Sequence, residues 1–129
     1  MKNLILFTIL FLNSFLVFGQ YEKTFIKSFN VNSDNIVFDI DCPKTISTWG
    51  NSYIKVELVV NTNFKPEIMD VFVKNGRYNF EVNNEKDVPI ISIPKIKNKV
   101  RLQDKDLIET FNLKIWLPES TKLKQGISL

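Results

Sequence analysis

A seven-residue stretch near the middle of the chain sets the expected fold. It reads Ile54-Lys55-Val56-Glu57-Leu58-Val59-Val60, with an apolar side chain at every second position. In a β-strand this period of two places residues 54, 56, 58 and 60 on one face. A strand with one apolar face needs a core on that side and tolerates water on the other. The stretch therefore predicts a half-buried strand of a β-sheet.

Three further stretches repeat this alternation of apolar and polar side chains. They are residues 36–41, 77–82 and 111–117. A weaker first strand is expected over residues 25–31, which carry Phe25, Phe29 and Val31 on one face. Together these stretches predict an all-β domain with mainly antiparallel or solenoid-like sheets.

Residues 88–93 are one more candidate strand. Pro89 lies near its start and Pro94 directly follows its end. Because proline cannot donate a ladder hydrogen bond, this strand is expected at the edge of a sheet.

One segment, residues 65–75, departs from the period of two. Pro66 and Glu67 suit the first turn of a helix, and Gly76 suits the position just after its end. Ile68 and Phe72 have helical spacing. Val71 and Val73 would also suit a strand, but β-branched residues weaken a helix only modestly. The prediction is one short helix.

The first nineteen residues resemble an export signal. A short basic start at Met1 and Lys2 precedes an apolar run from residue 4 to residue 12, and small side chains at Val17 and Gly19 suit a leader-peptidase site. The competing interpretation is a membrane anchor, for which the run is short and broken. We expect residues 1–19 to be a cleaved signal peptide and residues 20–129 to form a single domain.

Composition narrows the class of protein. Of the 129 residues, 44% are hydrophobic and 24% charged, which is typical of a globular chain. The chain has no His, the commonest general base and metal ligand. A net charge of +3 supplies no concentrated basic stripe for nucleic acid. The expected partners therefore exclude nucleic acid, and membrane contact is expected only through an uncleaved precursor.

The only basic cluster comprises Lys95, Lys97, Lys99 and Arg101, which alternate with other residues. The spacing is that of the solvated face of a strand. The alternative is a patch that meets an anionic surface.

Groups that carry catalysis or bind metals are sparse. Asp39 and Asp41 share a strand face, and Asp104 and Asp106 form a second pair, but neither pair has the spacing of a calcium loop. Solvated carboxylates are the favoured interpretation, with weak Ca²⁺ binding as the alternative. Cys42 can form no internal disulfide, and we interpret it as a small buried side chain. No catalytic, metal or cofactor site is predicted.

Two tryptophans stand out as candidate contact residues. Trp116 lies on the polar phase of its strand, next to Lys114. An outward tryptophan on a sheet marks either a contact surface or a spot that a neighbouring element covers. Trp49, just before Gly50, suits a position at a turn where its ring packs against the core. The candidate contact surface therefore comprises Trp116, Lys114 and Trp49.

Three stretches carry a resemblance to a family. They are residues 45–58, with Trp49 and Gly50 between a short and a longer strand, residues 73–78, and residues 113–123, where a strand ends in a turn at Pro118. Over residues 24–129 the chain resembles exported bacterial proteins grouped as an adhesin-like domain of unknown function with β-solenoid-like architecture. The resemblance implies no catalytic residues.

The Gly-rich repeats that continue such a solenoid are missing after Leu123. The resemblance thus implies the N-terminal region of the family's domain, shortened at its C-terminus. An unpaired strand edge there, beyond the run 111–117, would favour self-association.

These observations lead to two expectations of function. The favoured one is a non-enzymatic module of the cell envelope or surface, in the periplasm, on the outer surface or secreted. Its adhesin-like binding or structural role would involve another envelope protein or a glycan. The alternative is a small exported enzyme that uses carboxylates on a polysaccharide.

The exported protein should begin at Gln20, because the apolar run ends in Val17-Phe18-Gly19. Intact-mass measurement of exported material checks this. A mass equal to that of all 129 residues would contradict cleavage.

Overall fold

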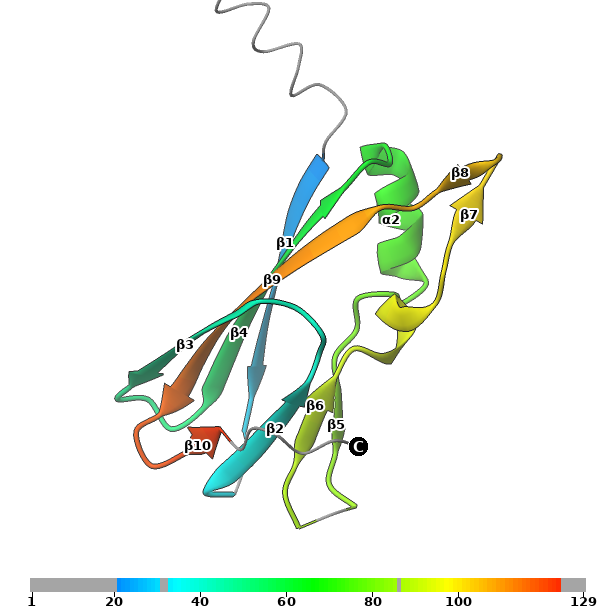
Figure 1. Cartoon of the computed structure of the whole chain (residues 1–129). Helices are drawn as coiled ribbons and strands as arrows, with labels where there is room; N and C mark the ends of the chain where they lie inside the picture. Colours follow the sequence, from blue (N-terminus) through cyan, green and yellow to red (C-terminus); the bar gives the residue numbers. More distant parts are fainter. Residues whose placement is uncertain (1–20, 31–32, 86, 124–129) are drawn as a thin grey trace, which may run out of the picture.

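The computed structural model describes residues 21–30, 33–85 and 87–123 (Figure 1). The elements, labelled as in Figure 1, are β1 (Tyr21–Phe29), β2 (Asn35–Asp39), β3 (Lys44–Trp49), β4 (Ile54–Thr62), α2 (Pro66–Lys74), β5 (Glu81–Asn83), β6 (Ile90–Ser92), η1 (Pro94–Lys97, a 3₁₀ helix), β7 (Arg101–Leu102), β8 (Lys105–Asp106), β9 (Glu109–Pro118) and β10 (Lys122–Leu123).

The long strands form sheet A, in the order β1-β4-β9-β3. β1 and β9 both run antiparallel to β4, and Leu58 of β4 lies opposite Leu113 of β9. β3 runs parallel to β9 at the other edge, with Ile46 opposite Ile115. β4 and β9, the two strands with the strongest alternation, therefore occupy the centre of the sheet.

The short strands form sheet B, in the order β10-β2-β6-β5. β2 runs parallel to both β6 and β10, whereas β5 and β6 are antiparallel. A separate hairpin joins β7 to β8 through Gln103 and Asp104, both of which have positive φ angles, as a two-residue hairpin turn requires.

The core lies between sheet A and the elements that cover its inner face. Sheet B covers one end of this face, and α2 lies toward the other end (Figure 1). The alternate residues of β4 from Ile54 to Val60 are at most 1% exposed. Sheet B contributes Ile36 and Ile91, and α2 contributes Met69, all fully buried. The opposite face of sheet A is the outer face.

The predicted helix over residues 65–75 is confirmed. α2 has Pro66 in its first turn and Glu67 near its positive end. Gly76 follows the helix with φ of 79°, where a Cβ atom would come within 2.9 Å of the Asn79 side chain. Glycine therefore suits this turn, because it adopts the left-handed region without the strain that a side chain would add.

The all-β prediction with one short helix is confirmed, and both sheets contain parallel as well as antiparallel neighbours. The strands expected at residues 36–41, 54–60 and 111–117 appear as β2, β4 and β9. The weaker first strand appears as β1, which begins at Tyr21.

Two predicted strands were wrong in extent. Within residues 77–82, only residues 81 and 82 belong to a strand, β5. Arg77 and Tyr78 are consecutive and both buried, which does not fit the alternation of a half-buried strand. Residues 95–101 are mostly not a strand, because η1 occupies Pro94–Lys97 and only Arg101 joins a ladder. The four basic side chains of this segment are nevertheless exposed, as expected.

The edge position predicted for residues 88–93 was also wrong. β6 lies inside sheet B, between β2 and β5. Its ladder is only three residues long, so Pro89 and Pro94 both fall outside it. Pro89 still takes part by accepting a hydrogen bond from the Val37 amide through its carbonyl oxygen, at 3.0 Å.

Both expectations about the chain ends fall largely on residues outside the described ranges. The predicted signal peptide at residues 1–19 and the segment 124–129 are outside them. The run 111–117 is not an edge, since β9 lies between β4 and β3, whereas β10 is an edge strand of sheet B. Within the described ranges, the structure has no helix of the length and apolar character that a membrane span requires.

Replacing Leu58 by Ala should reduce the free energy of unfolding by about 2–5 kcal/mol, because Leu58 is fully buried at the centre of sheet A. Ile26, on the outer face of β1, is 62% exposed, and Ile26→Ala should change it by less than about 0.5 kcal/mol. Urea unfolding of both variants is the measurement. Equal losses would contradict the assignment of inner and outer faces.

Candidate functional site

The outer face of sheet A carries an aromatic cluster, made of Trp49, Tyr53 and Trp116. The ring centroids of Trp49 and Tyr53 are 5.0 Å apart in an edge-to-face arrangement. Those of Trp49 and Trp116 are 6.4 Å apart, with an angle of 38° between the ring planes. Both separations lie in the range of favourable aromatic pairs.

Neighbouring polar groups hold the aromatic cluster in place. The indole N–H of Trp49 donates a 2.9 Å hydrogen bond to the Tyr53 carbonyl and so closes the turn between β3 and β4. The Lys55 ammonium lies 5.0 Å from the centre of the Trp116 ring, a cation–π contact. Lys55 also pairs with Glu57 at 3.6 Å. Each of the two tryptophan rings is thus held by a polar contact as well as by the other ring.

The structure places all three predicted contact residues on the outer face. Lys114 lies opposite Glu57 of β4 and Thr45 of β3, and is exposed. Trp116 lies opposite Lys55 and Ser47. Trp49 and Trp116 meet in the aromatic cluster, while Lys114 lies one row along the sheet from it. Both tryptophans are half-buried.

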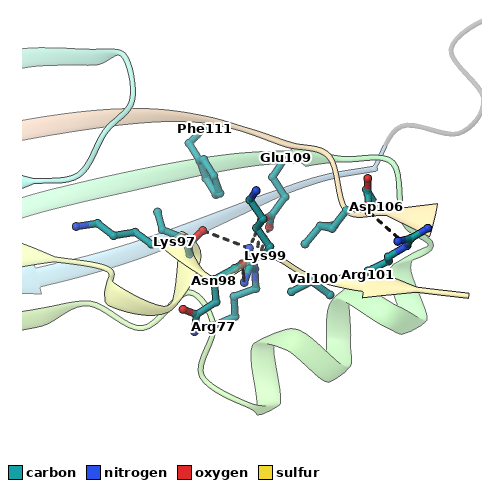
Figure 2. A pocket seen from close by; sticks show the side chains of 11 residues that line it. Arg77, Lys97, Asn98, Lys99, Val100, Arg101, Asp106, Glu109 and Phe111 are labelled. Atoms are coloured by element: carbon teal, nitrogen blue, oxygen red, sulfur yellow. Dashed lines mark hydrogen bonds and ion pairs between the residues drawn. The ribbon is translucent and has the colours of Figure 1, made fainter. Parts of the chain in front are cut away.

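A second feature is a cleft on the inner side of β9, with a volume of about 630 Å³ (Figure 2). The segment 96–101 forms one wall, and Asp106, Leu107, Glu109 and Phe111 contribute most of the rest. Arg77 also lines it. We call this feature the basic cleft, because Lys97, Lys99 and Arg101 lie along its wall.

Arg77 connects the wall of the basic cleft to β9. Its guanidinium pairs with the Glu109 carboxylate at 2.6 Å, and the two side chains are only 9% and 5% exposed. The same guanidinium donates 3.0 Å hydrogen bonds to the carbonyls of Lys95 and Asn98. A bidentate, charge-assisted pair of this kind is among the stronger polar interactions in proteins.

Tyr78 completes this network by donating its phenolic hydrogen to Glu109. Burial raises the pKa of Tyr78 well above its usual range, and the hydrogen bond and charge of Glu109 raise it further, while Arg77 opposes them. Because the folded-state pKa is raised, the neutral phenol contributes stability below about pH 10, the unfolded value. This contribution is lost as the pH rises toward the folded-state pKa.

Three of the four acidic side chains singled out in the sequence, Asp39, Asp104 and Asp106, lie in exposed ion pairs. Asp39 pairs with Lys97 at 3.7 Å, and Asp104 and Asp106 flank Arg101 at 3.9 and 3.8 Å. Over the parts of the chain that the structure describes, no three His, Cys, Asp or Glu side chains are grouped as a metal site requires.

Cys42 is half-buried. Burial raises the pKa of its thiol, Lys44 lowers it, and Asp41 raises it. Since the thiolate is the reactive form, a raised pKa makes this thiol a weak nucleophile at neutral pH.

Sequence reasoning missed Tyr53, Lys55 and the network of Arg77, Tyr78 and Glu109. The two consecutive buried residues after Gly76 break the alternation expected for a strand, and that break was the available signal. The partner Glu109 could not be inferred, because it lies far along the chain on another strand.

Comparisons with known proteins give no relative. The chain matches no protein-family model, no curated protein and no solved structure.

Arg77→Met should lower the free energy of unfolding by about 3–5 kcal/mol, because it leaves the buried Glu109 carboxylate without its counter-charge. Lys55→Met, which breaks an ion pair in contact with water, should cost at most about 1 kcal/mol. Chemical denaturation of the two variants provides the comparison. A small loss for Arg77→Met would mean that the network does not support the fold.

Proposed function

We propose that this chain is a non-enzymatic, exported module that binds another protein of the cell envelope through the outer face of sheet A. The single observation that carries the proposal is the aromatic cluster on that face. Trp49, Tyr53 and Trp116 lie together beside exposed polar residues. Tryptophan and tyrosine are the residues that most often dominate the energy of protein interfaces.

The dimensions of the outer face support a protein partner. Four strands about 4.8 Å apart, with nine residues rising about 3.3 Å each, cover roughly 20 by 30 Å. This is on the order of 600 Å², close to the 800 Å² that each partner contributes to a standard interface. Ile26, which is 62% exposed, adds apolar surface on the same face.

The arrangement of the rings favours a protein over a glycan. A flat sugar chain needs coplanar rings to stack on, whereas Trp49 and Trp116 are tilted by 38°. The Lys55 ammonium also occupies one side of the Trp116 ring. A protein side chain can enter the angle between two tilted rings, and edge-to-face contacts suit it.

The state of the carboxylates supports a role without catalysis. In the basic cleft, both oxygens of Glu109 accept hydrogen bonds from Arg77, and Tyr78 donates to one of them. Asp106 faces Arg101. Both carboxylates are thus already engaged by neighbouring side chains of the fold. Export is supported by the signal-like residues 1–19, and an adhesin-like role by the resemblance over residues 24–129.

Photo-crosslinking in intact cells of the source organism tests the proposal. A benzophenone amino acid replaces Thr45, which is exposed on the outer face, or Lys74, which is exposed on α2. We expect a discrete crosslinked protein from position 45 and none from position 74. Equal crosslinking from both positions would contradict a specific outer-face interface.

The crosslinked protein is then purified and its affinity measured. Trp116→Ala should weaken binding at least tenfold, about 1.4 kcal/mol, whereas Lys74→Ala should leave it unchanged. Because the chain has only two tryptophans and both lie in the aromatic cluster, their fluorescence reports on this face alone. A fluorescence change with purified envelope glycan, and none with the protein, would overturn the choice of partner.

A further inference from the structure

The basic cleft is a candidate binding site that is separate from the outer face. It opens on the inner side of β9, between that strand and the segment 96–101 (Figure 2). Its volume of about 630 Å³ lies within the range of small-molecule sites. Phe111 belongs to the inner phase of β9, whereas Trp116 and Lys114 belong to the outer phase. The two sites can therefore be tested independently.

The wall that carries the cations is held in a fixed shape. The Arg77 guanidinium donates hydrogen bonds to the carbonyls of Lys95 and Asn98, and its charge is matched by Glu109 beneath it. The Leu107 amide also donates to the Val100 carbonyl at 3.0 Å. A loop fixed in this way from both sides is preorganised, so a ligand need not pay the entropy of ordering it.

The charges of the basic cleft are unbalanced toward the positive. Arg77 and Glu109 neutralise each other, and Asp106 is the other acidic group of the lining, beside Lys97, Lys99 and Arg101. Just outside the lining, Asp39 pairs with Lys97 at 3.7 Å and Asp104 pairs with Arg101 at 3.9 Å. Figure 2 shows Lys97 and Arg101 toward opposite ends, with Lys99 between them. Lys99 forms no ion pair with any residue in the described ranges. The positive potential of the cleft is therefore centred on Lys99, and its concave shape focuses it.

The rest of the lining is apolar. Ile96, Val100, Leu107 and Phe111 contribute hydrocarbon surface beside the cations. An inorganic anion has no apolar surface to bury against these side chains. An organic anion can bury its apolar body there while its acidic group contacts the ammonium groups.

We propose that the basic cleft binds an organic oxoanion, meaning a carboxylate, phosphate or sulfate attached to a ring-shaped or apolar body. Lys99 contacts the acidic group, with Lys97 and Arg101 on either side. Phe111 and Ile96 contact the body. This site acts independently of the protein partner proposed for the outer face.

Titration of the ¹⁵N-labelled protein, followed by NMR, tests the site with three probes. The first is 1-naphthyl phosphate, which has both the oxoanion and the ring. The second is inorganic phosphate, and the third is uncharged 1-naphthol. We expect 1-naphthyl phosphate to bind at least tenfold more tightly than either of the others, with shifts confined to residues around 96–101 and 107–111.

Two variants of equal net charge provide the control. In the first, Lys97, Lys99 and Arg101 are replaced by Gln, and affinity for 1-naphthyl phosphate should fall at least tenfold. In the second, the exposed residues Lys27, Lys74 and Lys122 are replaced by Gln, and affinity should stay within twofold. Lys99→Glu, a single exposed change, should by itself also weaken binding at least fivefold.

Three results would overturn the proposal. Equal losses in the two triple variants would show general charge attraction, which added salt would remove in both. Inorganic phosphate binding as tightly as 1-naphthyl phosphate would show that the apolar wall is not used. The absence of localised shifts with 1-naphthyl phosphate at 10 mM would show that the basic cleft is not a ligand site.

Discussion

The buried pair of Arg77 and Glu109 is the interaction that holds together α2, η1 and the start of β9. Arg77 follows the helix α2, Glu109 begins β9, and the carbonyls that Arg77 also binds belong to η1 and the residue after it. One guanidinium therefore fixes three elements that share no ladder. Buried charges are costly when unpaired, so the α2 end, the η1 segment and the start of β9 must assemble together. The basic cleft exists because this assembly leaves the side chains of 97–101 around a hollow.

Much of the fold could be predicted from local pattern, and the reason is visible in β4. Its residues alternate strictly between buried and half-buried positions, so the period of two in the sequence directly reports its environment. The helix α2 was predictable because Pro66 and Gly76 mark its ends. The pairing of strands was not predictable, since β3 and β9 are brought together by contacts that no local pattern encodes.

The candidate sites were predictable in part. The outward phase of Trp116 followed from the alternation of β9, but its meeting with Trp49 depends on the parallel pairing of β3 with β9. The basic segment 95–101 was visible as a cluster of charge. Its curved path was not, because the hydrogen bonds that bend it come from Arg77, which looked like one residue of a strand. In both cases the sequence showed which residue types were available, but it did not show how the fold would bring them together.

The position of β9 in sheet A has a consequence for the order of events in a newly made chain. β9 is among the last elements of the described sequence, yet it lies between β4 and β3. Until residues 109–118 arrive, β3 has no neighbour in sheet A and β4 has β1 alone. Closure of long loops makes such topologies slow to fold. A chain built in this way cannot complete sheet A before residues 109–118 have been made.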